Sequence, residues 1–323
     1  GDKIRFRKGL PQKIGGWTKF SADYYVGIGR ALEQWYSLDG SRYEALGTDR
    51  KIYVYQSGDN QDITPIRSTD ALVNAISTTT SSNIITITDT SHGALQGDFV
   101  TLSNVSTAVA GIPAATLDAE YEILSISNAN AYTIESSATA NANTGPTANC
   151  TATYQLNIGP SIQTFGYGWG ASTWGASTWG TPRSTSSVIL DARLWSINNW
   201  GEDLIITQKD GGTYEWDLSG GMSTNRATAI ANAPTTSTLS IISTETRHVI
   251  CMGTETTIGD STTFDKMFIR WSDQENYNFW TPNVTNSAGS QRIAGGSEIR
   301  CARPAKGTIL VWTDTTMQSM SFI

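Results

Sequence analysis

The stretch Arg193–Asp217, RLWSINNWGEDLIITQKDGGTYEWD, has the clearest pattern in the chain and predicts a β-hairpin. Residues 204–207 form a short apolar, β-branched run, and residues 213–216 return with alternating aromatic side chains. The polar loop between the two runs contains Gly211 and Gly212, which supply the positive φ that such a reversal needs. The stretch therefore predicts two antiparallel strands joined by a short turn.

Three further segments repeat this order of strand, polar turn and strand. They are residues 43–55 (YEALGTDRKIYVY), residues 249–271 with a longer loop, and residues 308–323 (TILVWTDTTMQSMSFI). From Ile206 to Ile250 is 44 residues, and from Ile250 to Leu310 is 60. Spacings of this size are typical of one small antiparallel sheet per unit. The sequence predicts an all-β fold, a β-propeller built of small antiparallel sheets; a single sandwich with irregular loops is the alternative.

The composition changes near Ser68. From there to about Gln155 the chain is rich in Ser, Thr, Ala and Asn, almost free of Lys and Arg, and without Trp. Strands are predicted within it at residues 84–87, 98–102, 120–126 and 131–134. We expect a small inserted β-barrel or sandwich domain at 68–155, between propeller parts at 1–67 and 156–323, because insertions at exposed loop tips are tolerated. We also expect the natural protein to extend beyond both ends.

Charge and motifs restrict the function classes. The 323 residues contain 22 Lys and Arg against 29 Asp and Glu, a formal net charge of −7, which argues against wrapping DNA through its phosphates but not against DNA passing nearby. No apolar run is long enough to span a membrane. Nucleophile-elbow, Walker, HExxH and dinucleotide motifs are absent from the sequence. We therefore expect no catalytic, cofactor-binding or metal residues, and a protein that is not an enzyme.

Single residues that often carry chemistry have plainer interpretations here. Cys251 and Cys301 lie in apolar runs and are predicted to be buried small hydrophobes. His92 precedes a Gly and is predicted to be a turn residue. Residues 58–62 (GDNQD) lack the ligand spacing of an EF-hand and predict an acidic turn.

The first candidate interaction residues are Arg5, Arg7 and Lys8, in a basic N-terminal segment where Ile4 and Phe6 alternate with the charges. Such a strand could meet an acidic partner or nucleic acid. The plainer interpretation, which we favour, is a solvated strand face that closes the propeller.

The second candidates are Trp169, Trp174 and Trp179, which recur every five residues and are each followed by Gly. This loop could dock into a neighbouring subunit, because Trp is a frequent interface anchor. It could equally fold back over its own blade, and carbohydrate stacking is a third possibility.

Several segments resemble the packaged-DNA stabilisation proteins of tailed bacteriophages, which are similar to the tail nozzle, tubular or hub proteins of short-tailed phages. These segments are residues 5–17 (RFRKGLPQKIGGW), 46–48 with 51–55, 62–67, 199–205 (NWGEDLI), 211–217 (GGTYEWD) and 270–273. The stretch 89–94, with 97–100, also resembles a small β module that recurs inside phage structural proteins.

The resemblance implies a structural virion protein, made in the host cytoplasm and located in the phage tail below the portal and adaptor. It implies a ring of copies, commonly six, that closes the packaged-DNA channel and forms the ejection conduit. Implied partners are the portal, adaptor and tail fibre proteins, and passing double-stranded DNA without sequence-specific binding. The alternative is a glycan-binding or glycan-cleaving β-propeller that recognises a host receptor.

Overall fold

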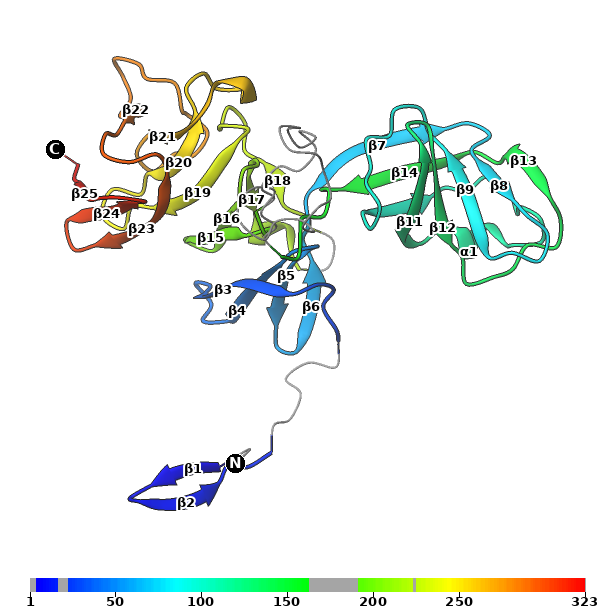
Figure 1. Cartoon of the computed structure of the whole chain (residues 1–323), viewed down its shortest axis with the longest axis horizontal. Helices are drawn as coiled ribbons and strands as arrows, with labels where there is room; N and C mark the ends of the chain where they lie inside the picture. Colours follow the sequence, from blue (N-terminus) through cyan, green and yellow to red (C-terminus); the bar gives the residue numbers. More distant parts are fainter. Residues whose placement is uncertain (1–3, 17–22, 163–190, 223–224, 323) are drawn as a thin grey trace, which may run out of the picture.

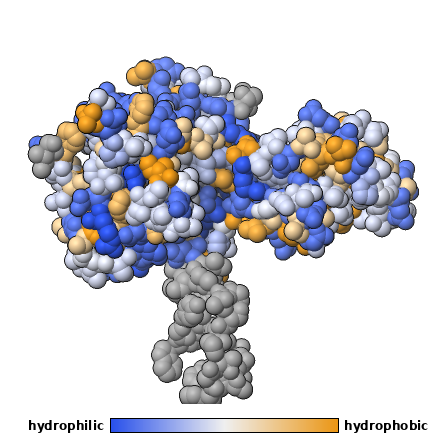
Figure 2. Space-filling view, turned by 90° about the horizontal axis from the view of Figure 1, so that it is seen from above, coloured by the Kyte–Doolittle hydropathy of each residue, from blue (hydrophilic) through white to orange (hydrophobic). Residues whose placement is uncertain are grey.

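The computed structural model describes residues 4–16, 23–162, 191–222 and 225–322. It is an all-β fold with three parts: an N-terminal hairpin, a body of four small antiparallel sheets, and an eight-stranded lobe on one side of the body (Figure 1). Figure 2 shows the lobe projecting from the side of the body. Among the described residues, no helix is long and apolar enough to cross a membrane.

The body consists of four meanders in chain order, in which each strand pairs with the next. The first sheet contains β3 (Gly29–Tyr36), β4 (Arg42–Thr48), β5 (Ile52–Gln56) and β6 (Asp59–Asp62), and the second contains β15 (Trp195–Trp200), β16 (Asp203–Gln208), β17 (Thr213–Trp216) and β18 (Thr228–Ala229). The third contains β19 (Ser237–Ile242), β20 (Val249–Glu255), β21 (Phe264–Trp271) and β22 (Gly289–Arg292), and the fourth contains β23 (Ile299–Ala305), β24 (Thr308–Thr313) and β25 (Met317–Met320). Short 3₁₀ turns, η1 (Leu218–Gly220) and η2 (Ser261–Thr263), follow β17 and precede β21.

Successive sheets pack face to face, as propeller blades do. The first strands of the four sheets are neighbours, with β15 against β3, β19 against β15, and β23 against β19. Each contact has its own apolar core, built around Trp35 and Trp216 between the first two sheets, Trp200 and Trp280 between the next two, and Ile250 between the last two. The prediction of a β-propeller built of small antiparallel sheets is confirmed.

The residue pattern of each middle strand follows from this packing. In β16, Leu204 and Ile206 face the first sheet while Ile205 faces the third, so all three are fully buried. A strand covered on both faces needs a continuous apolar run. In the first sheet, Ile52 and Val54 of β5 are buried toward the second sheet. Tyr53 between them is also buried, and its hydroxyl accepts the Val26 N–H.

A glycine permits close contact between the first two sheets. The indole of Trp195 lies against Gly47, where an added Cβ would come within 2.7 Å of Cδ1 of the ring. The same indole donates its Nε1–H to the carbonyl oxygen of Thr48 at 2.6 Å. Trp195 therefore fastens the innermost strand of the second sheet onto β4.

The inserted lobe spans residues 66–155 and has a separate core. Its strands are β7 (Ile66–Leu72), β8 (Ile76–Thr78), β9 (Ile84–Thr88), β10 (Phe99–Ser103), β11 (Glu120–Asn128), β12 (Ala131–Glu135), β13 (Thr144–Thr147) and β14 (Cys150–Gln155), with the one-turn helix α1 (Ala114–Leu117) between β10 and β11. The strand order is β13-β8-β9-β12-β11-β10-β14-β7, and these outermost strands do not pair with each other, so the described sheet is not a closed barrel. It bends around the apolar core that includes Ile85, Val100 and Ile123.

A buried polar network fixes the interior of the lobe. The Tyr154 hydroxyl donates to Oδ2 of Asp89 at 2.6 Å and lies 3.0 Å from the Tyr132 hydroxyl. His92 accepts the Ala94 N–H at Nδ1, so its proton lies on Nε2, which is 3.1 Å from the Asn128 carbonyl oxygen. Because His92 is buried and both ring nitrogens are used, it holds a turn, as predicted.

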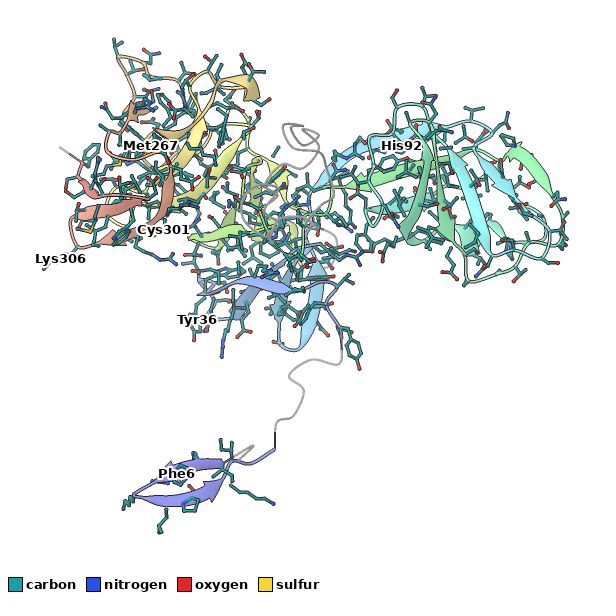
Figure 3. The ribbon with its side chains drawn as sticks, in the orientation of Figure 1. Phe6, Tyr36, His92, Met267, Cys301 and Lys306 are labelled. Carbon is teal, nitrogen blue, oxygen red and sulfur yellow. The ribbon has the colours of Figure 1, made fainter. Side chains whose placement is uncertain are left out.

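Two predictions about cysteines have different outcomes. Cys251 in β20 is buried between the second and third sheets, as expected. Cys301 in β23 is exposed, so the prediction that it is buried is wrong (Figure 3). The reason is register: Cys301 pairs with Trp312 on the outer face of the fourth sheet, while its neighbour Ala302 faces the third sheet.

Candidate interaction surfaces

The N-terminal hairpin carries three of the predicted interaction residues. It consists of β1 (Ile4–Arg7) and β2 (Leu10–Lys13), joined by a two-residue turn at Lys8 and Gly9 with φ of 53° and 79°. Within the described residues these strands pair only with each other, and the hairpin stands apart from the body (Figure 1). The interpretation that this strand closes the propeller stays a prediction, because residues 17–22, which join the hairpin to the body, lie outside the described residues. Arg5, Arg7 and Lys8 are all exposed.

The two faces of the hairpin differ in chemistry. Cross-strand partners lie on the same face, so Ile4, Phe6 and Pro11 share one face with Lys13. Arg5, paired with Gln12, and Arg7, paired with Leu10, lie on the other face. Phe6 is 77% exposed and Leu10 70% exposed, and Figure 3 shows Phe6 far from the other labelled residues. A two-stranded hairpin is at best marginally stable alone, so these exposed apolar side chains, one on each face, indicate a partner.

A groove of about 980 Å³ lies between the third and fourth sheets. Its walls include Ile250 and Trp271 of the third sheet and Met320 at the end of β25. Glu245 and Arg292 add one charge of each sign. The groove runs between β22 and β25, the outermost described strands of their two sheets.

His248 lines this groove, but its side-chain contacts hold two loops together, which is a structural role. Its Nδ1 is 2.7 Å from Oγ1 of Thr246, and its Nε2 is 3.0 Å from Oγ of Ser287. Ser287 Oγ also accepts the Gln274 N–H and contacts Oδ1 of Asp273 at 2.8 Å. The Asp273 carboxylate therefore hydrogen-bonds to Ser287 and not to His248. In a serine-hydrolase triad the carboxylate bonds to the histidine, so these three residues do not form one. Burial lowers the pKa of His248, and the Asp273 charge acts in the opposite direction.

An ionic cluster joins the lobe to the body. We call it the Lys51 cluster; it contains Lys51, Asp62, Glu120, Gln155 and Arg226. Lys51 Nζ lies 2.9 Å from Oδ2 of Asp62 and also contacts Glu120 at the start of β11. The same ammonium lies 4.2 Å from the ring centroid of Phe99 in the lobe. Lys51 is only 3% exposed, so its charge is compensated almost entirely by protein groups.

Other groups complete the cluster. The Gln155 amide donates to Asp62 at 3.2 Å and to Glu120 at 2.5 Å. Arg226, next to the second sheet, lies 3.3 Å from Asp62. Burial acts to raise the pKa of Asp62, but Lys51 and Arg226 together hold it below its ordinary value. The cluster therefore fixes the lobe against two sheets of the body.

Sequence reasoning missed the Lys51 cluster because its members are far apart in the chain. The only signal is a lysine at the start of the apolar run KIYVY (residues 51–55).

Trp169, Trp174 and Trp179 lie outside the described residues. Residues 58–62 contain strand β6, and within the described parts of the chain no group of three or more His, Cys, Asp or Glu side chains could hold a metal ion.

No family model matches the chain, and no curated protein matches it. Among solved structures, the chain is similar to the "Phage phi92 endosialidase", at 11% sequence identity and a TM-score of 0.28. The match covers 94% of this chain and 43% of that protein, so the chain spans less than half of its length. A likeness at this score carries no information about activity.

Proposed function

We propose that the chain is a structural protein of a bacteriophage tail that forms a ring with copies of itself, at the nozzle or hub below the portal and adaptor. The ring, of six copies, closes the packaged-DNA channel and becomes the ejection conduit. The sequence resemblance of residues 5–17 and 199–217 to packaged-DNA stabilisation proteins supports this assignment. In this proposal the chain performs no catalytic step.

The observation that carries the proposal is the projecting hairpin. Phe6 and Leu10 are exposed on an arm that no described part of the body covers. Exposed apolar side chains on a marginal two-stranded element indicate a binding partner. The outer face of the first sheet adds a second uncovered surface, with Leu32 69% and Tyr36 61% exposed (Figure 3).

The charge distribution also suits this role. Residues 1–16 contain five Lys and Arg and one Asp, and the remaining chain contains 17 basic and 28 acidic residues, a formal net charge of −11. A basic arm and an acidic body attract each other between copies. An acidic channel wall does not hold phosphates, so DNA can slide past it.

Assembly is the first testable consequence. Mass photometry of the purified protein is expected to show a hexamer near 209 kDa, six times the 34.9 kDa chain. Because the arm is basic and the body acidic, the assembly should weaken as salt is raised. A particle that stays at the monomer mass at every concentration and salt would contradict the proposal. A monomer that binds or cleaves an oligosaccharide on a glycan array would favour the receptor-binding alternative instead.

A further inference from the structure

The Lys51 cluster places an amine against a carboxyl group. Lys51 Nζ lies 2.9 Å from Oδ2 of Asp62, and the Lys51 side chain is only 4% exposed. The ring of Phe99 covers the amine, with its centroid 4.2 Å from Nζ. The carboxylate of Glu120 contacts the same nitrogen. The cluster therefore holds a nucleophile, an electrophile and a second carboxylate in direct contact, with the nucleophile shielded from water.

We propose that Lys51 and Asp62 join in an intramolecular isopeptide bond. The lone pair of Lys51 Nζ attacks Cγ of Asp62, so that an Nζ–Cγ bond forms, the Cγ–Oδ2 bond breaks, and Oδ2 leaves as water. One ammonium and one carboxylate give one amide and one water, so atoms and charge balance without an oxidant or a co-reactant. The reaction happens once in each molecule and is not turnover of a substrate, and it does not depend on the ring.

The two carboxyl oxygens of Asp62 have different partners. Oδ1 accepts the Thr64 N–H at 2.9 Å and lies 3.3 Å from Nη1 of Arg226. Oδ2 contacts Lys51 Nζ and accepts the Gln155 amide at 3.2 Å. Nucleophilic attack moves negative charge onto the oxygen that stays, and donors already in place there stabilise the tetrahedral intermediate. Oδ1 is therefore the oxygen that is retained, and Oδ2 is the one that leaves.

Glu120 is placed to move the protons. It contacts Lys51 Nζ through Oε1, while its Oε2 accepts the Gln155 amide at 2.5 Å. Glu120 accepts a proton from the ammonium, which frees the lone pair, and returns it to Oδ2 of Asp62 as that oxygen leaves. Its side chain is 35% exposed, so the released water can escape past it. Because Glu120 belongs to β11, the bond forms only when the lobe is docked on the body.

Proximity favours the product. Amide formation between separate molecules is unfavourable in water, but groups held in one site react with effective concentrations of about 10⁵–10⁸ M. Burial acts to raise the pKa of Asp62, but the Lys51 and Arg226 charges hold it below its ordinary value. The neutral carboxyl that an amine attacks is therefore rare, and we expect linkage to follow folding slowly. The ion-pair stabilisation by Lys51 belongs to the unlinked chain.

The bond ties the outermost strand of the first sheet to its neighbour. Lys51 directly precedes β5, and Asp62 is the last residue of β6, after which the chain enters the lobe at β7. The sequence of β6, DNQD, contains no apolar residue, so hydrophobic burial contributes little to its attachment. A covalent link at Asp62 holds this strand, and with it the start of the lobe, on the body.

Intact-mass spectrometry of the purified, folded protein tests the proposal. We expect a mass lower than that of the sequence by one water molecule. Trypsin does not cleave after a linked lysine, so residues 51–67 should remain one peptide that is lighter by one water and yields no fragment ions from breaks between positions 51 and 62. This localisation separates the bond from succinimide formation at Asp39-Gly40 or Asp210-Gly211, which also releases water. A folded protein that keeps its full mass after prolonged incubation would overturn the proposal.

A variant and an internal control test the chemistry. Glu120→Gln keeps the size of the side chain but cannot accept the proton; because such catalysis contributes about 10²–10⁴-fold, the linked fraction should fall to background over the same incubation. Circular dichroism of this variant checks that it remains folded. Lys266 and Glu298 also lie 2.9 Å apart, but the Lys266 side chain is 51% exposed, so this pair should stay unlinked. Full linkage in folded Glu120→Gln, or equal water loss at Lys266, would overturn the mechanism.

Discussion

Lys51→Met is expected to destabilise the body and release the lobe, at a cost of about 3–5 kcal/mol, which is typical of removing one partner from a buried ion pair. The substitution keeps the length of the side chain but leaves Asp62 and Glu120 without the ammonium that both contact. Calorimetry should show a lower unfolding temperature. Hydrogen exchange should be faster at the ends of β5, β6 and β11, where the cluster joins the lobe to the first sheet.

Arg42→Met is the matched control. Arg42 also pairs with a carboxylate of the first sheet, Glu44, but its side chain is 55% exposed. Exposed pairs contribute at most about 1 kcal/mol, so this variant should unfold close to the unmodified protein. Equal shifts for the two variants would show that the Lys51 cluster does not hold the lobe.

The same cluster predicts a pH dependence with a defined sign. The folded-state pKa of Asp62 lies below its ordinary value of 3.8. Its ionised form therefore contributes stability above pH 3.8, and the contribution is lost as the pH falls below 3.8 through the folded pKa. The stability difference between the unmodified protein and Lys51→Met should narrow in that range. A difference that stays constant would contradict the role of Asp62.

Trp216→Ala should cost about 3–5 kcal/mol, the usual range for emptying a large aromatic site in a core. Trp216 is fully buried between the first two sheets and meets the Trp35 ring edge-on, with centroids 6.2 Å apart. Its Nε1–H donates to the Asn225 carbonyl oxygen at 3.1 Å. The loss of stability should appear as a lower denaturant concentration at the unfolding midpoint. Unfolding is monitored by tryptophan fluorescence.

Phe279→Ala is the control for this second prediction. Phe279 is also aromatic, but 56% exposed. Surface substitutions of this kind usually change stability by less than about 0.5 kcal/mol. A Trp216→Ala variant as stable as Phe279→Ala would show that the first two sheets are not joined through this core.

The middle strands of the body sheets were predictable because their pattern of apolar residues indicates which side chains are buried. The continuous run at 204–206 belongs to a sheet covered on both faces. In β5 the aliphatic residues Ile52 and Val54 alternate with tyrosines and are the ones that pack toward the second sheet. The outer strands β6 (DNQD) and β22 (GSQR) contain no large apolar residue, so nothing in their sequence marks them. Backbone pairing to β5 and β21 defines them.

The candidate surfaces were predictable only in part. The alternation of Ile4 and Phe6 with Arg5 and Arg7 indicates a strand with two chemically different faces, and the structure shows that strand. Its separation from the body depends on tertiary packing, which the local pattern does not contain. The Lys51 cluster joins residues 51, 120 and 226, and only the folded chain brings such distant charges together.

A reconstruction of the phage particle by cryo-electron microscopy tests the central claim most directly. The proposal predicts copies of this chain in a symmetric ring on the tail axis, with the four-sheet body around the DNA channel and each N-terminal hairpin on a neighbouring copy. Copies placed singly at the periphery of the tail, or absent from the particle, would contradict it.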